Sequence, residues 1–235
     1  MVDKRGGRTS AALTQLVLAA FGPVCHLRLP GCTRVATTKD HLIPWSLGGT
    51  NDLANLRPAC KTCNSRRGNR IISGYGARVV VVIGPPAAGK SYYVREHAAL
   101  NDVVIDLDTI ARAFMPVPPD STHTYPEHIR DVAIGARKAA IDRATHRAYG
   151  CTVWLIHALP HPNTMAEYLA FKYQVVTIDP GRAIVQQRAL AERPAIMRPI
   201  VDRWYASPYA KPSQPLVVEA ASPLALTGGE WAPEW

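Results

Sequence analysis

Four of the five cysteines lie in the first third of the chain, at Cys25, Cys32, Cys60 and Cys63. Cys60 and Cys63 form a C-x-x-C pair, which could be a redox couple, half of a tetrahedral zinc site or two unrelated buried thiols. A redox pair is expected at a helix start near a βαβ pattern, and none surrounds these residues. A region of about seventy residues has a marginal core that a structural zinc would stabilise. The spacing therefore favours Zn²⁺ held by all four thiolates, whereas Cys151 opens an apolar run and is expected in the core.

A second chemical motif is the stretch GPPAAGKS at Gly84–Ser91, which matches the phosphate-binding pattern G-x-x-x-x-G-K-[ST] in full. It follows an apolar run and opens a helical pattern, which is the context that a P-loop requires. The loop amides surround the β-phosphate of a nucleotide, the lysine reaches the β- and γ-phosphates and the hydroxyl holds Mg²⁺. We expect ATP or another nucleoside triphosphate, with Mg²⁺ on Ser91, at Gly84, Pro85, Ala87, Ala88, Gly89, Lys90, Ser91 and Tyr92.

Polar residues with a regular order lead up to the C-x-x-C pair. They are Asp40-His41, Pro44, Gly48-Gly49, Asn55-Leu56 and Cys60-x-x-Cys63-Asn64. Over residues 23–70 this pattern resembles the zinc-stapled HNH endonucleases common in phages, with asparagine in place of the final histidine. The resemblance implies a ββα-metal domain in which His41 is the general base and Asp40 and Asn64 bind a catalytic Mg²⁺ or Mn²⁺. Asn55 would fix the loop or orient His41.

The chemistry of phosphodiester cleavage agrees with these residue types. A neutral imidazole can take a proton from water near pH 7, and a hard divalent ion can stabilise the developing charge. Arg66, Arg67 and Arg70 follow Asn64 closely, so we expect them to contact the phosphates around the scissile bond.

Acidic and basic residues beyond the P-loop indicate phosphoryl transfer. Asp106 and Asp108 follow the second expected strand of this part, and Arg188 and Arg193 lie in a stretch expected to form a lid. Over 79–206 these features resemble the phage-type polynucleotide 5'-kinases among the small P-loop kinases. The resemblance implies Asp108 as the general base, with Asp106 second, and Arg188 and Arg193 as contacts of ATP or of the transferred phosphoryl group.

Two positions depart from that kinase pattern. The family usually has an arginine three residues after its catalytic aspartate, but here Ala111 stands there and Arg112 follows. The third strand ends at His157 where the family often has an acidic residue, and this histidine is either a polar strand end or a catalyst. The phosphate acceptor therefore stays open between a polynucleotide, a nucleoside or nucleotide and a modified base in DNA.

The elements that must position these residues indicate an α/β protein in two parts. We expect a small zinc-stapled ββα-metal nuclease domain at 1–73, beginning with a helix from Ser10 to Gly22, and a P-loop kinase domain at 78–235. Short apolar strands between helices predict a parallel sheet flanked by helices, followed by a Pro-rich tail. Strands are expected at 78–83, 103–106, 152–156 and 174–178, and helices at 89–99, 127–149, 163–172, 181–192 and near 195–206.

Charge is distributed unevenly between the two parts. Residues 1–78 hold 12 Lys/Arg and 3 Asp/Glu, which equals the formal net charge of +9 of the whole chain. The N-terminal part is therefore expected to bind DNA or RNA, although a solubilising surface would have the same composition. No apolar run approaches the ~20 residues of a membrane span, and no export signal is evident. We expect a cytoplasmic protein, and we leave open that it is phage-encoded and acts in the cytoplasm of the host.

Three interpretations of the whole chain remain. The first is a bifunctional enzyme for nucleic-acid processing or repair, with a metal-dependent endonuclease and a polynucleotide 5'-kinase. The second is a nuclease gated by a P-loop ATPase, although the strand ending at His157 lacks the acidic residue of such ATPases. The third is a zinc-stapled DNA-binding module without nuclease activity, which Asp40, His41 and Asn64 argue against. The sequence does not predict the oligomeric state.

Overall fold

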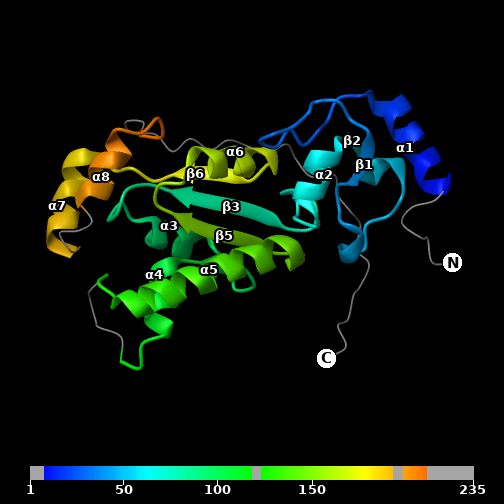
Figure 1. Cartoon of the computed structure of the whole chain (residues 1–235). Coiled ribbons are helices and arrows are strands. Elements are labelled where there is room, and N and C mark those ends of the chain that lie inside the picture. Colours follow the sequence, from blue (N-terminus) through cyan, green and yellow to red (C-terminus); the bar gives the residue numbers. More distant parts are fainter. Residues whose placement is uncertain (1–7, 118–122, 193–197, 211–235) are drawn as a thin grey trace.

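The computed structural model describes residues 8–117, 123–192 and 198–210, and they form two separate sheets (Figure 1). The N-terminal part contains helix α1 (Arg8–Phe21), which ends at Gly22 as expected, and a two-stranded antiparallel sheet of β1 (Thr38–His41) and β2 (Leu56–Ala59). Two short 3₁₀ turns, η1 (Trp45–Leu47) and η2 (Leu53–Asn55), connect the strands, and helix α2 (Lys61–Arg67) follows β2. This order of two strands and a helix is the expected ββα arrangement.

The C-terminal part is built on a four-stranded parallel sheet with the order β4-β5-β3-β6. Its strands are β3 (Arg78–Ile83), β4 (Val103–Ile105), β5 (Thr152–His157) and β6 (Gln174–Thr177). Each lies within one residue of its expected end points. The prediction of a mixed α/β fold with a parallel sheet flanked by helices is therefore confirmed.

Helices cover both faces of this sheet, which explains why β3 is an unbroken run of β-branched residues. Val80 and Val82 pack with Val94 of α3 (Lys90–His97) on one face. Val79 and Val81 face the other side, in a cluster with residues of α5 (Glu127–Arg147) and α6 (Pro162–Ala170).

The remaining helices lie near the ends of the strands. Helix α4 (Leu107–Ala113) follows β4 directly and was not expected from the sequence. Helices α7 (Arg182–Glu192) and α8 (Arg198–Tyr205) pack against Ala87 and Ala88 of the P-loop. In Figure 1, α7 and α8 lie beyond the carboxyl ends of the strands, and the N-terminal part lies at the opposite end.

Backbone and apolar contacts join the two parts. Ile71 N donates to Thr145 O at 2.7 Å and Ser73 N donates to Phe171 O at 2.9 Å. The hydrophobic cluster runs without a break from Cys25, Cys60 and Cys63 through Ile71 and Ile72 to β3 and β5. The two parts are therefore packed against each other rather than separated by an open linker.

Candidate functional sites

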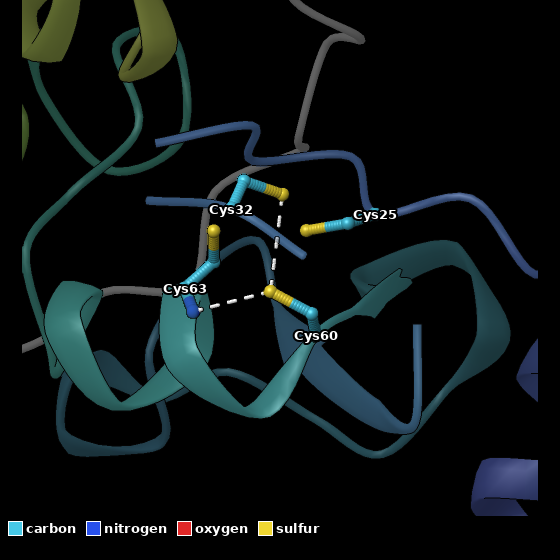
Figure 2. A group of neighbouring side chains, drawn as sticks. All are labelled: Cys25, Cys32, Cys60 and Cys63. Atoms are coloured by element: carbon cyan, nitrogen blue, oxygen red, sulfur yellow. Dashed lines mark hydrogen bonds between the residues drawn. The ribbon is translucent and has the colours of Figure 1, made fainter. Parts of the chain in front are cut away.

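The four predicted cysteine ligands converge at one place, as Figure 2 shows. Their sulfur atoms all lie within 4.8 Å of one another, and Cys32 Sγ lies 3.8 Å from Cys60 Sγ. Two thiolates bound at about 2.3 Å to one tetrahedral zinc are separated by about this distance. Cys25 and Cys32 come from the segment after α1, whereas Cys60 and Cys63 lie at the start of α2. Four thiolates with this geometry fit a structural zinc.

The local backbone prepares the sulfur atoms for a cation. Cys60 is the N-cap of α2 and its Sγ accepts from Cys63 N at 3.3 Å, while Cys32 Sγ accepts from Arg34 N at 3.2 Å. Burial raises the pKa of the Cys60 thiol, but hydrogen bonds from Cys63 and Thr33 outweigh burial and lower this pKa to about 6. Cys60 is thus the readiest thiolate ligand near neutral pH, whereas burial raises the pKa of the Cys32 and Cys63 thiols.

His41, the expected general base, ends β1 opposite Leu56 of β2. Its Nε2 lies 2.9 Å from Asn51 Oδ1, and its ring meets the exposed Trp45 edge-on at 6.2 Å between centroids. Because an amide oxygen only accepts, this contact places the proton on Nε2 and leaves Nδ1 with a lone pair that can take a proton from water. Asn51 was not singled out from the sequence, which offered no signal for this contact.

Asn55 holds the loop between β1 and β2. Its Oδ1 accepts from Ile43 N at 2.8 Å, and its Nδ2 donates to Ile43 O at 3.1 Å and to Thr50 O at 2.9 Å. Gly49 belongs to the same loop, where an added Cβ would lie 1.9 Å from Ile43 O. Of the two roles expected for Asn55, its contacts are those of loop fixation, whereas Asn51 contacts His41.

Asp40 and Asn64, the expected catalytic-metal ligands, both lie beside β1. Asp40 is 3% exposed and its carboxylate accepts from His26 Nε2 at 2.8 Å and from Arg67 Nη1 at 2.5 Å. Asn64 Nδ2 donates to Lys39 O at 2.8 Å and to Thr38 Oγ1 at 3.1 Å. The Asp40 carboxylate already has protein partners, and Asn64 would bind a metal through Oδ1 rather than through the donating Nδ2. The roles of both residues as metal ligands stay predictions.

Of the three arginines after Asn64, Arg67 differs from the expected phosphate contacts, whereas those of Arg66 and Arg70 stay predictions. Arg67 is 1% exposed and, besides Asp40, it donates to the backbone oxygens of His41 and Leu42, so its expected contact with a phosphate is wrong. Arg66 and Arg70 pair with Glu167 of α6 at 2.7 Å and 3.4 Å. These three arginines therefore hold structure together within the described residues: one inside the N-terminal part and two at its contact with the C-terminal part.

The P-loop lies between β3 and α3 as expected. Lys90 Nζ donates to Gly84 O at 2.9 Å and to Pro85 O at 2.7 Å, and Ser91 Oγ donates to Asp106 Oδ2 at 3.1 Å. Gly84 is required by packing, because an added Cβ would lie 2.1 Å from Ile178 O. The Ser91 hydroxyl and the Asp106 carboxylate form an oxygen pair of the kind that Mg²⁺ prefers.

A cavity of about 660 Å³ opens over this loop. It is lined by P-loop residues, by Asp106 and Asp108 after β4, and by Arg188 of α7. Asp108 Oδ2 lies 2.8 Å from His123 Nδ1. Arg193, expected beside Arg188, lies outside the described residues. The cavity thus joins one expected lid arginine and both candidate bases to the P-loop.

Two residues that line this cavity at the end of the sheet, His157 and Arg137, are partly buried. Burial lowers the pKa of His157 to about 4, helped by Arg137 and Lys90, so this histidine is neutral at pH 7. Arg137 Nη2 donates to Ile156 O at 2.8 Å. The sequence contained one signal for Arg137: it occupies the stripe Ala133, Arg137, Ile141 and Thr145, where four-residue spacing places an arginine on the inward face of α5.

Comparison with known proteins gives two family matches, one in each part of the chain. The family model of HNH endonucleases matches residues 23–70, and a model described as an AAA domain matches residues 79–195. The chain therefore combines an HNH endonuclease domain with a P-loop, kinase-like domain. Below, residues 8–73 are called the nuclease region and the part from residue 78 onward the kinase region.

One curated relative comes from a phage. It is the "Gene 4 protein" of Mycobacterium phage D29, which is 37% identical over 51 residues in the nuclease region. The match covers 22% of this chain and 49% of the phage protein. No solved structure gives a significant match. Within the described residues, no helix is long and apolar enough to cross a membrane.

Proposed function

We propose that the chain is a bifunctional nucleic-acid processing enzyme, with a metal-dependent HNH endonuclease and an ATP-dependent polynucleotide 5'-hydroxyl kinase. The two activities divide at residues 73–78, and the protein acts in the cytoplasm, on nucleic acids of a phage-infected host. One observation carries the kinase assignment: Lys90, Ser91, the two aspartates and Arg188 line a single cavity. A triphosphate and a carboxylate that can deprotonate a hydroxyl are thereby brought together.

The kinase step uses these groups in defined roles. The 5'-hydroxyl oxygen forms a bond to the γ-phosphorus of ATP while the bond between that phosphorus and the β–γ bridging oxygen breaks, which releases ADP. Asp108 takes the hydroxyl proton, and Lys90 and Arg188 stabilise the charge on the transferred group. Asp106 and Ser91 would hold Mg²⁺, which would supply positive charge to neutralise the phosphates.

The nuclease step begins with proton transfer from water to Nδ1 of His41. The water oxygen attacks the phosphorus, the bond to the 3' oxygen breaks, and this oxygen takes up a proton from solvent. The products carry a 3'-hydroxyl and a 5'-phosphate. Mg²⁺ or Mn²⁺ at Asp40 and Asn64 would stabilise the charge on the phosphate, once Asp40 exchanges a present contact for the ion. Since this cut already leaves a 5'-phosphate, the kinase serves 5'-hydroxyl ends that another agent has made.

The experiment combines two assays on one preparation. A 5'-hydroxyl oligonucleotide with γ-labelled ATP measures phosphoryl transfer, and supercoiled plasmid with Mg²⁺ or Mn²⁺ measures cutting. Asp108→Ala should lose transfer and His41→Ala should lose cutting, each by about a hundredfold or more. ATP hydrolysis without transfer to any acceptor would favour an ATPase that gates the nuclease, and cutting that persists in His41→Ala would remove the HNH mechanism.

A further inference from the structure

A second cavity, of about 740 Å³, adjoins the nucleotide pocket and is not used by the proposed chemistry. It lies between α5 and α6 on one face of the parallel sheet, and we call it the α5–α6 groove. Leu107, Arg137 and His157 line both cavities, so the groove begins where the nucleotide pocket ends. Its lining also includes Arg70 of the nuclease region. The groove therefore extends from the kinase pocket toward the end of the sheet at which the nuclease region lies.

Two side chains of the groove have buried polar atoms that are poorly paired. Arg137 Nε forms no hydrogen bond within the described residues, and Tyr173 Oη lies near Thr145 without a hydrogen bond of good geometry. Tyr173 is 6% exposed, and burial raises the pKa of its hydroxyl far above its ordinary value, so Oη keeps its proton and can donate. A buried donor without a partner costs about 1–3 kcal/mol, and native structures contain few of them. Because both atoms are covered by neighbouring protein atoms, the groove offers a ligand the rest of the Arg137 guanidinium and the Tyr173 ring rather than these two atoms.

The walls of the groove indicate what else this ligand contains. They are mainly apolar, and they include the aromatic residues Tyr168, Phe171 and Tyr173. The basic lining residues are Arg70, Arg137 and Lys138, and the acidic ones are Asp142 and Glu167. Glu167 already pairs with Arg66 and with Arg70 of this lining, which leaves Arg137 and Lys138 against Asp142. An anionic group joined to a flat, partly apolar ring satisfies such a surface, and a nucleotide has both parts.

We propose that the α5–α6 groove binds the second nucleotide of the phosphoryl acceptor. The terminal 5'-hydroxyl lies at Asp108, the phosphate on its 3' side lies at Arg137, and the next base enters between α5 and α6. This inference rests on the proposed kinase function, and it makes the acceptor a strand of at least two nucleotides. Arg137 is then a specificity residue for polynucleotides.

The test is a series of acceptors of increasing length with saturating ATP. Nucleoside 3'-monophosphate has no second base, whereas a 5'-hydroxyl dinucleotide and trinucleotide do. For the wild-type chain, KM should fall about tenfold from the monophosphate to the dinucleotide and change little to the trinucleotide, because one stacked base supplies about this much affinity. The short acceptors avoid binding across the nuclease region.

Gly135→Leu fills the groove without disturbing the fold. Gly135 lines the groove, and an added Cβ would meet no atom within 4 Å. This variant should erase the gain in KM for the dinucleotide and leave KM for the monophosphate unchanged. Gly135→Ala controls for the higher helix propensity, and melting temperatures of both variants check the fold.

Arg137→Gln removes the proposed phosphate contact and should raise KM for both acceptors about tenfold or more. Its matched control is Arg143→Gln, which makes the same change at an exposed position of α5 outside both cavities. Two results would overturn the groove proposal while the kinase function stands. One is phosphoryl transfer by the wild-type chain with equal KM for the monophosphate and the dinucleotide. The other is a Gly135→Leu variant whose KM for the dinucleotide is still lower than that for the monophosphate. If no acceptor is phosphorylated, the kinase function itself fails.

Discussion

The nuclease and kinase regions place their functional groups by different means. In the nuclease region the site residues are held by contacts with one another: Asp40 with His26 and Arg67, and His41 with Asn51. In the kinase region they gather at the carboxyl ends of parallel strands, around a cavity of about 660 Å³. The small region therefore relies on a four-cysteine cluster that fits zinc and on a buried polar network, whereas the layered fold gathers its groups by topology.

This contrast also appears in what joins the two regions. Arg66 and Arg70 leave the nuclease region to pair with Glu167, while their neighbour Arg67 turns inward to Asp40. This short basic stretch thus contributes one buried side chain to the nuclease region and two side chains to the contact with the kinase region. Loss of the buried Arg67–Asp40 pair should lower the free energy of unfolding far more than loss of the exposed Arg66–Glu167 pair.

Loss of the zinc site should have the largest effect. We expect Cys63→Ser to lose the bound zinc and to unfold the nuclease region, because a structural zinc contributes much of the stability of so small a core. Cys151→Ser is the matched control, since Cys151 lies outside the four-cysteine cluster. Metal content by mass spectrometry and circular dichroism measure the outcome, and zinc retained by Cys63→Ser would refute the assignment.

The next largest effect is expected for Arg67→Met. The substitution leaves Asp40 buried without its charged partner, so the free energy of unfolding should fall by about 3–5 kcal/mol. Arg66→Met removes an exposed pair and should change it by about 1 kcal/mol or less. Denaturant titration distinguishes them. Equal stability of both variants, with DNA affinity lost only in Arg67→Met, would restore the phosphate-contact role of Arg67.

The kinase region should lose stability in acid through His157. Its pKa falls from 6.5 to about 4 on folding, so the unfolded chain binds a proton in this range and the folded chain does not. Stability at pH 7 is therefore lost as pH falls from about 6.5 to about 4, by up to about 3 kcal/mol. His157→Gln should flatten this part of the pH dependence in urea titrations. His128→Gln, at an exposed position, should leave the pH dependence of the free energy of unfolding unchanged. If His157→Gln also leaves it unchanged, His157 is not the source of the acid destabilisation.

Asn51→Ala should have a smaller effect, confined to nuclease activity. Without the acceptor at Nε2, the His41 ring loses its fixed orientation and tautomer, and kcat for plasmid cutting should fall about a hundredfold. The pH–rate profile should shift as well, which a merely structural role would not cause. Asn51→Asp keeps an acceptor and should restore part of kcat; equal loss in both variants would show that Asn51 does not position His41.

The sequence by itself determined the features that depend on neighbours along the chain. The P-loop is a contiguous motif, and the strands are β-branched runs that a doubly covered parallel sheet must bury. The four-cysteine cluster could be predicted because few other kinds of site use cysteines in this spacing. Helix α4 was missed because its apolar pattern is only two turns long, although Asp106 at its start is a typical N-cap.

Only the tertiary structure decided which polar groups meet. Arg66 and Arg67 are adjacent and identical in type, yet one is half-exposed and the other is buried, because helix periodicity turns neighbouring side chains to different faces. His26 reaches Asp40 across 14 positions, and Asn51 rather than Asn55 reaches His41. The α5–α6 groove likewise unites residues from Arg70 to Tyr173. Such contacts depend on how distant segments pack, which local propensity and spacing do not encode.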